Sequence, residues 1–374
     1  MPNSFRGALS WEWRSYLAGV FVCLTTGVPY FYLIVTVNAM QPILERFIAD
    51  SLQMRCSGRY VIAVPETALV WVWSLFLTLP SIWAIVGSFL SNRVADVAGR
   101  KLGILLGGAG LSMLSCLAFA TAQPLESVIL LCVGASLQHF MVGMATPICN
   151  TYLAETTAPS LHGAAMMLSM ALRPVGDLSG SVASLETTLG TPGCWWRVYA
   201  LCGMPMVLVI VTGVLFLPES PKWLFLTKEK PEAARTSMRM YNVPEDKRDG
   251  LLELMREEAI SVNREKTTHR MTMAELVFDR RHARFVATVV VVLCAATASG
   301  SYLLSTYSTI FLHHCGLSIP VAQMYTVARG VMAVLGDFSN VVMVKRVNRR
   351  PLILWAQVFT CGTFGLATFL GVMK

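Results

Sequence analysis

Long apolar runs separated by polar segments dominate this chain of 374 residues. Each run is close to the roughly 20 residues that a helix needs to cross a bilayer. Because backbone hydrogen bonds must close internally in lipid, the runs predict membrane-spanning helices. The alternating pattern typical of strands in a membrane β-barrel is missing. We place about nine spans, at 17–38, 67–90, 102–121, 127–152, 163–185, 196–217, 285–311, 320–344 and 351–373.

Two of the polar segments between these runs are long. Residues 39–66 separate the first two spans, and we expect a loop there. The second segment divides the chain into six spans and three. We therefore expect a six-helix bundle, a polar segment with amphipathic helices and a partial second bundle, at 1–217, 218–284 and 285–374.

The second polar segment contains a helical pattern of its own. Apolar residues recur there at helical spacing, which predicts an amphipathic helix at the membrane surface or against the ends of the spans. These residues are Leu251, Leu252, Met255, Ala259 and Val262.

Composition supports an all-α membrane protein. Hydrophobic residues make up 55% of the chain, charged residues 14%, and the mean hydropathy is +0.57. A soluble domain has about 25% charged residues, so a water-facing globule is excluded, as are a disordered chain and a collagen-like fibre. Ten cysteines lie mostly inside apolar runs, without CxxC pairs or Cys/His metal spacing. We expect no metal, no cofactor and no enzymatic activity, since no nucleophile–base set appears in the polar segments.

The distribution of basic residues predicts the orientation. The net charge is +8, and 23 of the 30 Lys and Arg residues fall on one side of the membrane if the N-terminus is cytoplasmic. Basic residues are enriched in cytoplasmic loops, so this balance indicates a multi-pass topology rather than a nucleic-acid partner.

Two short basic loops occupy equivalent places six spans apart. One is "DVAGRK" at 96–101 and the other "KRVNRR" at 345–350. Paired repeats across a long central segment are typical of transporters. Short cytoplasmic loops are basic in most membrane proteins, however, so this similarity alone leaves both explanations open.

Further motifs follow in a fixed order. They are "YLAETTAPSLHGA" after span four, "LPESPKWLFL" after span six, and "ELVFDRRHARF" and "YSTIF" around span seven. The ordered set resembles the sugar-transporter family of the major facilitator superfamily, close to the facilitative hexose carriers of solute carrier family 2. The resemblance implies alternating access, with a small-molecule solute and the lipid bilayer as partners, in the plasma membrane. It leaves the oligomeric state open.

The resemblance also implies a cytoplasmic gate. Its basic residues would bridge to two glutamates when the inner side is closed and separate from them on opening. One exposed ion pair contributes about 0–1 kcal/mol, but several together can set a two-state balance. The predicted gate residues are Asp96, Gly99, Arg100, Lys101, Glu155, Glu219, Arg349 and Arg350.

The positions that bind sugar in hexose carriers differ here. Aligned on Gly163 and Gly300, a span-five glutamine becomes Met170, and a span-seven glutamine and asparagine become Thr297 and Tyr302. A methionine cannot hydrogen-bond to sugar hydroxyls, so a hexose is in doubt as the substrate. The cavity candidates are Met170, Arg173, Asp177, Thr297, Tyr302 and Tyr307.

Four of the charged residues lie inside predicted spans. Arg173 and Asp177 are four residues apart in span five, and Arg329 and Asp337 lie in span eight. Charges at such depth are costly and usually face the interior of the bundle. They indicate either a cavity for an anionic or polyol solute or a structural ion pair within each helix.

Two functions remain open. The first is a carrier of a sugar-like solute, polyol or organic anion. The second is a non-transporting sensor or regulatory isoform, because the family fold has twelve spans and the predicted ninth ends at Lys374.

Overall fold

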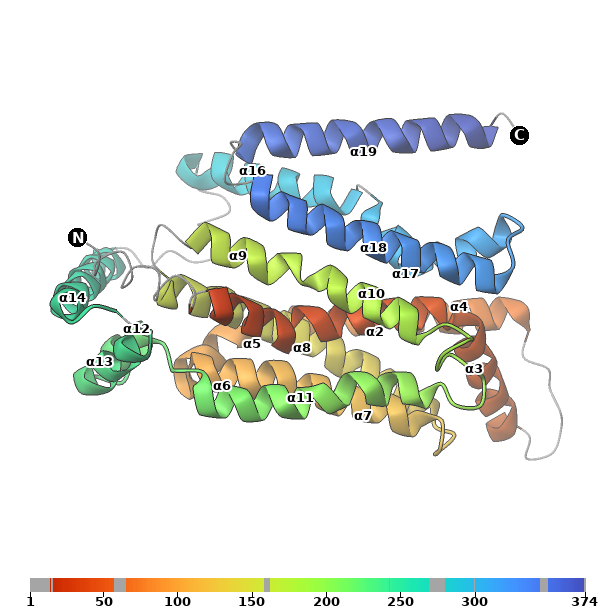
Figure 1. Ribbon diagram of the computed structural model, residues 1–374, viewed down its shortest axis with the longest axis horizontal. Helices are drawn as coiled ribbons and strands as arrows, with labels where there is room; N and C mark the ends of the chain where they lie inside the picture. The colour runs from red at the N-terminus through yellow and green to blue at the C-terminus, as the bar shows by residue number, and fades with distance from the viewer. Residues whose placement is uncertain are drawn as a thin grey trace, which may run out of the picture.

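Helices form almost all of the computed structural model, which has no strand in the part that it describes. It describes residues 14, 16–56, 65–157, 162–241, 243–268, 280–298, 300–343 and 349–372, some of them by their backbone alone. Most helices run side by side along the long axis (Figure 1). Helices α12–α14 lie at one end of the molecule and α3 at the other, and we call these the α12 end and the α3 end.

Six helices in the described part are long and apolar enough to cross a membrane. This agrees with the predicted fold class, whereas the count of nine spans stays a prediction. The six are Tyr16–Ala39 (including α2, Gly27–Ala39), Thr67–Ala98 (α4, Glu66–Thr78, and α5, Pro80–Ala98), Arg100–Ala122 (α6, Arg100–Ile104; a π-helical turn, Leu105–Gly110; α7, Leu111–Ala122), α8 (Val128–Thr156), α11 (Trp196–Phe216) and α18 (Ile319–Met343).

The fifth and seventh predicted spans are each divided into two helices. Span five comprises α9 (His162–Ala171) and α10 (Arg173–Ala183), and Pro174 in the first turn of α10 prevents a continuous helix. Span seven comprises α16 (Arg280–Ala298) and α17 (Ser301–His314). The prediction of one run over 285–311 is wrong because Gly300 adopts a left-handed conformation with φ +75°. The last helix is α19 (Arg349–Val372).

The predicted loop at 39–66 contains a helix, α3 (Gln41–Cys56). Its Leu44 and Ile48 are fully buried, and the ring of Phe47 packs edge-on against Trp195. This helix was missed in the sequence because its residues are polar on average, which hides the apolar stripe along one face.

Three helices follow span six: α12 (Pro221–Leu226), α13 (Pro231–Met240) and α14 (Glu245–Thr268). Leu252 of α14 is buried, and Leu251 and Met255 pack against the core at the α12 end. This agrees with the amphipathic helix expected there; the side chains of Ala259 and Val262 lie outside the described residues.

Glycines let the first six spans pack backbone to backbone. A Cβ at Gly143 of α8 would lie 2.0 Å from the Ala84 carbonyl oxygen of α5. A Cβ at Gly176 of α10 would lie 2.1 Å from the Val28 oxygen of α2. Small residues give membrane helices this close approach, which yields van der Waals contact where lipid offers no hydrophobic driving force.

The last spans lie against one side of this bundle (Figure 1). Helix α17 contacts α2, and α18 contacts both α9 and α10. The α10–α18 contact is the most extensive between the two parts, and we call it the seam. A Cβ at Gly330 of α18 would lie 3.1 Å from the Cα of Leu178 on α10, so the seam is closely packed.

We predict that Gly143→Ala lowers the thermal unfolding temperature of the detergent-purified protein. The new methyl group must push α5 and α8 apart, and overpacking of this kind costs about 1–3 kcal/mol. Gly336→Ala in α18 is the control, because nothing lies within 4 Å of the added Cβ. Equal unfolding temperatures for the two variants would contradict the close packing of α5 and α8.

Candidate functional site

A buried ion pair joins the α5–α6 turn to the end of α8. Arg100 donates to Glu155 in two parallel bonds, Nε to Oε2 at 3.1 Å and Nη2 to Oε1 at 3.1 Å. Both side chains are 11% exposed. Nη1 of Arg100 also donates to the Ala95 carbonyl oxygen at 3.0 Å and contacts Asp96 at 3.3 Å. Such two-pronged arginine–carboxylate pairs combine strength with a defined geometry.

The carboxylate of Glu219 binds the start of α6. Its Oε1 accepts the backbone N–H groups of Arg100 at 2.9 Å, Lys101 at 3.0 Å and Ser220 at 2.9 Å. Gly99 has φ +94°, and a Cβ there would lie 2.5 Å from Glu219 Oε2. The glycine therefore allows both the turn and the close approach of the carboxylate.

Two tyrosines fasten the α12–α14 segment to the spans. The Tyr152 hydroxyl donates to the Pro218 carbonyl oxygen at 2.8 Å, so it accepts the hydrogen bond that it shares with Tyr241. Burial raises the pKa of the Tyr241 hydroxyl well above its usual range, which keeps it protonated as a donor. Trp223 Nε1 donates to the Asp96 carbonyl oxygen at 3.0 Å.

The structure brings together most of the predicted gate, but inside one bundle. Every partner of Arg100 named above belongs to the first six spans or to the segment that follows them. The Lys101 ammonium group donates to the Val214 carbonyl oxygen at 2.8 Å rather than to a carboxylate. These contacts all lie within the first six spans and the segment that follows them, and their separation on opening stays a prediction. The side chains of Arg349 and Arg350 lie outside the described residues.

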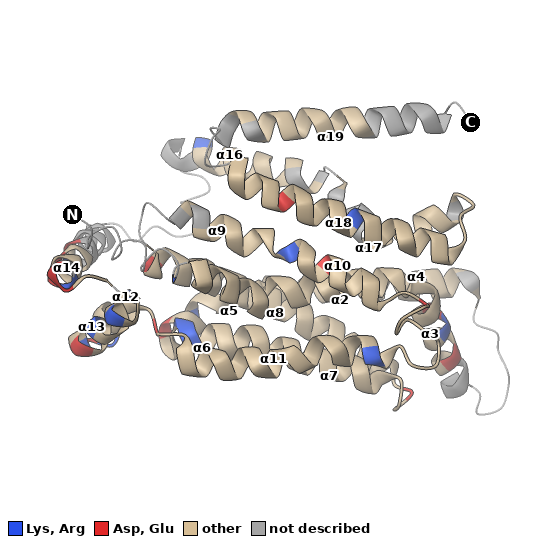
Figure 2. Ribbon diagram, viewed as in Figure 1, with Lys and Arg blue, Asp and Glu red and all other residues tan. Residues whose placement is uncertain are grey.

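The four charged residues within the spans meet at the seam. Figure 2 shows an acidic and a basic residue on each of α10 and α18, in otherwise uncharged stretches. Arg329 Nη2 lies 2.7 Å from Asp177 Oδ1, and Asp177 is 5% exposed. The alternative of an ion pair within each helix is therefore wrong for Asp177, whose partner lies across the seam. Arg173 lies against Gly27 of α2 and interacts electrostatically with Asp337.

Polar contacts also join the two parts at the α3 end. Asn38 Nδ2 donates to Ser308 Oγ of α17 at 3.0 Å. Gln323 Nε2 of α18 donates to the carbonyl oxygens of Ala39 at 3.2 Å and Ser184 at 3.5 Å. Sequence inspection missed these residues, although an asparagine and a glutamine at the ends of apolar runs were the available signal.

A cavity of about 410 Å³ lies between the two parts. Helices α2, α4, α5, α7 and α8 supply most of its wall, and α17 supplies the rest. Its lining residues are Leu33, Ile34, Val37, Phe76, Leu77, Thr78, Ser81, Phe119, Ala135, Gln138, His139, Thr306 and Tyr307.

Among the predicted cavity residues, Tyr307 lines this space. Met170 is 38% exposed and is not part of the wall. Thr297 is exposed, and its hydroxyl donates back to the Leu293 carbonyl oxygen at 2.6 Å. The side chain of Tyr302 lies outside the described residues. Within the described part, no three His, Cys, Asp or Glu side chains gather to hold a metal ion.

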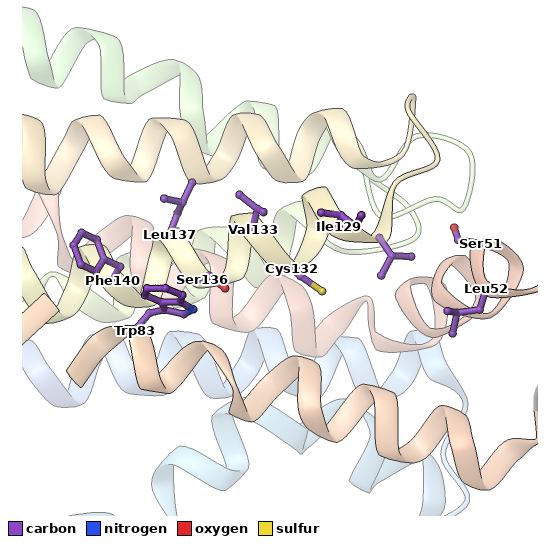
Figure 3. A pocket seen from close by; sticks show the side chains of 10 residues that line it. Ser51, Leu52, Trp83, Ile129, Cys132, Val133, Ser136, Leu137 and Phe140 are labelled. Carbon is purple, nitrogen blue, oxygen red and sulfur yellow. The ribbon is translucent and has the colours of Figure 1, made fainter. Parts of the chain in front are cut away.

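A wider groove of about 640 Å³ lies elsewhere, between Trp83 of α5 and one face of α8 (Figure 3). Leu52 of α3 closes one end and Phe140 lies at the other. All of its lining residues belong to α3, the second span and α8, and most are apolar. Because the second part of the chain does not contribute, relative movement of the two parts would leave this groove unchanged.

Comparisons with known proteins place these features in context. The family model described as "Sugar (and other) transporter" matches residues 19–374. Facilitated glucose transporter member 4 of solute carrier family 2 from Mus musculus is 26% identical over 349 residues, covering 93% of this chain and 67% of the relative. Member 3 from Gallus gallus is 26% identical over 359 residues, covering 96% and 69%.

Solved structures show the same fold. The major facilitator superfamily proton:xylose symporter XylE bound to 6-bromo-6-deoxy-D-glucose aligns with a TM-score of 0.70 at 16% identity, over 91% of this chain and 71% of that one. A partially occluded inward-open XylE from E. coli aligns with a TM-score of 0.65 at 17% identity, over 90% and 75%.

We predict that Glu155→Gln destabilises the protein by about 3–5 kcal/mol, because it leaves the buried Arg100 guanidinium without its counter-charge. The measurement is the unfolding free energy, or the shift in unfolding temperature, in detergent. Arg100→Gln combined with Glu155→Gln should recover much of the loss, since neither charge then remains. A double variant that is less stable than Glu155→Gln alone would contradict the pairing.

Proposed function

We propose that this chain, which belongs to the sugar (and other) transporter family, moves a small sugar-like solute across a membrane by alternating access. The observation that carries the proposal is the cavity between the two parts, whose wall includes Gln138 from α8 and Tyr307 from α17. A cavity whose wall comes from both parts of the chain opens to one side of the membrane or the other when the two parts move relative to each other. Support also comes from the relatives, which are named as facilitated glucose transporters.

The proposed orientation places the α12 end in the cytoplasm and the α3 end outside, in the plasma membrane. The basic residues of 218–284 support this, since 14 of the 30 Lys and Arg lie there. In that orientation the bonds of Asn38 and Gln323 close the outer side of the cavity in the state described. Their release is then the step that admits solute from outside.

The seam supplies the second element of the mechanism. Helices α10 and α18 run in opposite directions in the proposed topology. The basic residue of each helix therefore lies on the side of the acidic residue of the other. Arg173 and Asp177 are four residues apart, about 6 Å along the helix, whereas Arg329 and Asp337 are eight apart, about 12 Å. With Asp177 bound to Arg329, Arg173 and Asp337 stay out of register by about 6 Å.

This mismatch gives the seam two electrostatic arrangements. The observed Asp177–Arg329 pair holds the state in which the α3 end is closed. A shift of α18 along α10, or bending at the break before Arg173, brings Arg173 to Asp337 and favours closure at the α12 end. Each arrangement keeps one of the two acid–base pairs together, so the loss of one pair is offset by the formation of the other.

We predict uptake of radiolabelled D-glucose or D-xylose into proteoliposomes that contain the purified chain. Asp177→Asn should lower the initial rate at least tenfold, because it removes the acidic partner of Arg329 across the seam. The charge-exchanged double variant, Asp177→Arg with Arg329→Asp, should recover part of the rate. Folded wild-type protein that takes up neither these sugars nor myo-inositol would favour the non-transporting alternative.

Topology is tested with epitope tags in intact cells. A tag after Gly193, where an added Cβ would meet nothing within 4 Å, should react with antibody added outside. A tag after Glu229, in the exposed turn between α12 and α13, should react only after permeabilisation. Surface reaction of the Glu229 tag would overturn the proposed orientation.

A further inference from the structure

Gln138 is a buried polar residue in the wall of the cavity whose side chain is only partly hydrogen-bonded. It lies in the interior of α8 and is 2% exposed. Its Oε1 accepts a weak hydrogen bond of 3.4 Å from Ser112 Oγ. Its Nε2 has no hydrogen-bond partner among the described residues. A buried amide donor without an acceptor is costly, so its retention next to a cavity points to an acceptor supplied from the cavity.

His139 adds an acceptor next to this donor. Its Nδ1 lies 2.9 Å from the Ala135 carbonyl oxygen, which can only accept, so Nδ1 carries the hydrogen. In the neutral ring, Nε2 is then the acceptor. Neighbouring donor and acceptor groups suit a molecule with hydroxyl or ether oxygens.

The remaining wall limits the chemistry of the ligand. Phe76 and Phe119 offer aromatic faces, and Leu33 and Val37 offer aliphatic ones. No Asp, Glu, Lys or Arg is among the lining residues that the structure describes. Since an unpaired ion would lose its hydration here without gaining a counter-charge, the wall selects an uncharged ligand. The volume of about 410 Å³ falls within the range of small-molecule sites.

We propose that Gln138 is the recognition residue for the solute, donating from Nε2 to an oxygen of a small neutral molecule whose apolar face packs on Phe76 and Phe119. This rests on the proposed function only in identifying the ligand with the transported solute. The site uses α2, α4, α5, α7, α8 and α17, and thus differs from the positions of Met170 and Thr297 expected from the sequence. It excludes an organic anion as the ligand of this cavity.

Binding to the full chain in lipid nanodiscs tests the proposal with three probes, phenyl β-D-glucopyranoside, D-glucose and D-gluconate. We expect the phenyl glucoside to bind most tightly, glucose more weakly, and gluconate not at all. Gln138→Leu should weaken binding of the phenyl glucoside about tenfold, because it removes the donor while keeping the size. Its unfolding temperature should not fall, since an unpaired buried donor is removed.

Ser112→Ala is the matched control, since it removes the bond to Oε1 and keeps the Nε2 donor. It should change affinity less than twofold. A purely structural Gln138 would instead give equal losses in both variants, and that result overturns the proposal. Tight binding of gluconate, no binding of any probe to the wild type, or an unchanged Kd in Gln138→Leu also overturns it. Gln138→Met serves as a second donor-free variant if Gln138→Leu does not fold.

Uptake measurements separate this proposal from the proposed function. If probe binding depends on Gln138 but the wild type shows no uptake, the binding site is supported and the proposed transport function is contradicted. If uptake occurs and Gln138→Leu does not change it, transport is supported and recognition of the solute by Gln138 is contradicted.

Discussion

A hydrocarbon environment gives polar groups no water to bind, and this constraint underlies most of the structure. Every backbone N–H and C=O within the membrane must be satisfied by the protein itself, which is why the described spans are helices. Polar side chains within the membrane must likewise find hydrogen-bond partners in the protein. Many Ser and Thr residues within the spans donate to carbonyl oxygens of the preceding helical turn or of a neighbouring helix, as Ser115 does to Gly134 at 2.7 Å.

The same constraint explains why the charges occur in two separate groups. At the α12 end, Arg100, Glu155 and Glu219 satisfy one another and also bind free N–H groups at helix starts, so the group acts as a rigid joint. At the seam, Asp177 and Arg329 come from helices in different parts of the chain. A charge pair within one bundle strengthens that bundle, whereas a pair between bundles ties their relative position to electrostatic energy. Only the second kind can respond to movement.

Sequence patterns predicted the spans well because length and hydrophobicity decide membrane insertion. The resemblance of the ordered motifs to the sugar-transporter family also grouped Asp96, Gly99 and Arg100 with Glu155 and Glu219, and the structure places these residues together. Breaks within spans were less visible. Gly300 and Pro174 are possible signals, but prolines also lie inside continuous spans, as Pro147 and Pro205 do. Only the backbone conformation therefore shows that the helices end there.

Partners across the seam could not be predicted, because spacing within a helix shows which side chains share a face and not what that face meets. Arg173 and Asp177 at i and i+4 fit an ion pair within one helix, and the structure instead pairs Asp177 with a residue 152 positions away. Gln138 was overlooked for a related reason. One glutamine in an apolar run has no pattern, and only the three-dimensional structure shows that its Nε2, beside a cavity, has no partner in the described part of the chain.

These observations suggest how to separate structural from functional polar residues inside a membrane protein. A polar group that serves only the fold should be satisfied by the fold, as Arg100 and Tyr152 are. A group that binds a transient ligand must lack a partner for part of the transport cycle, and stability is lost whenever the ligand is absent. Gln138 has the second property, whereas Asp177 is fully committed to Arg329 in the state described. Under these proposals, recognition of the solute and control of the conformation are thus assigned to different residues.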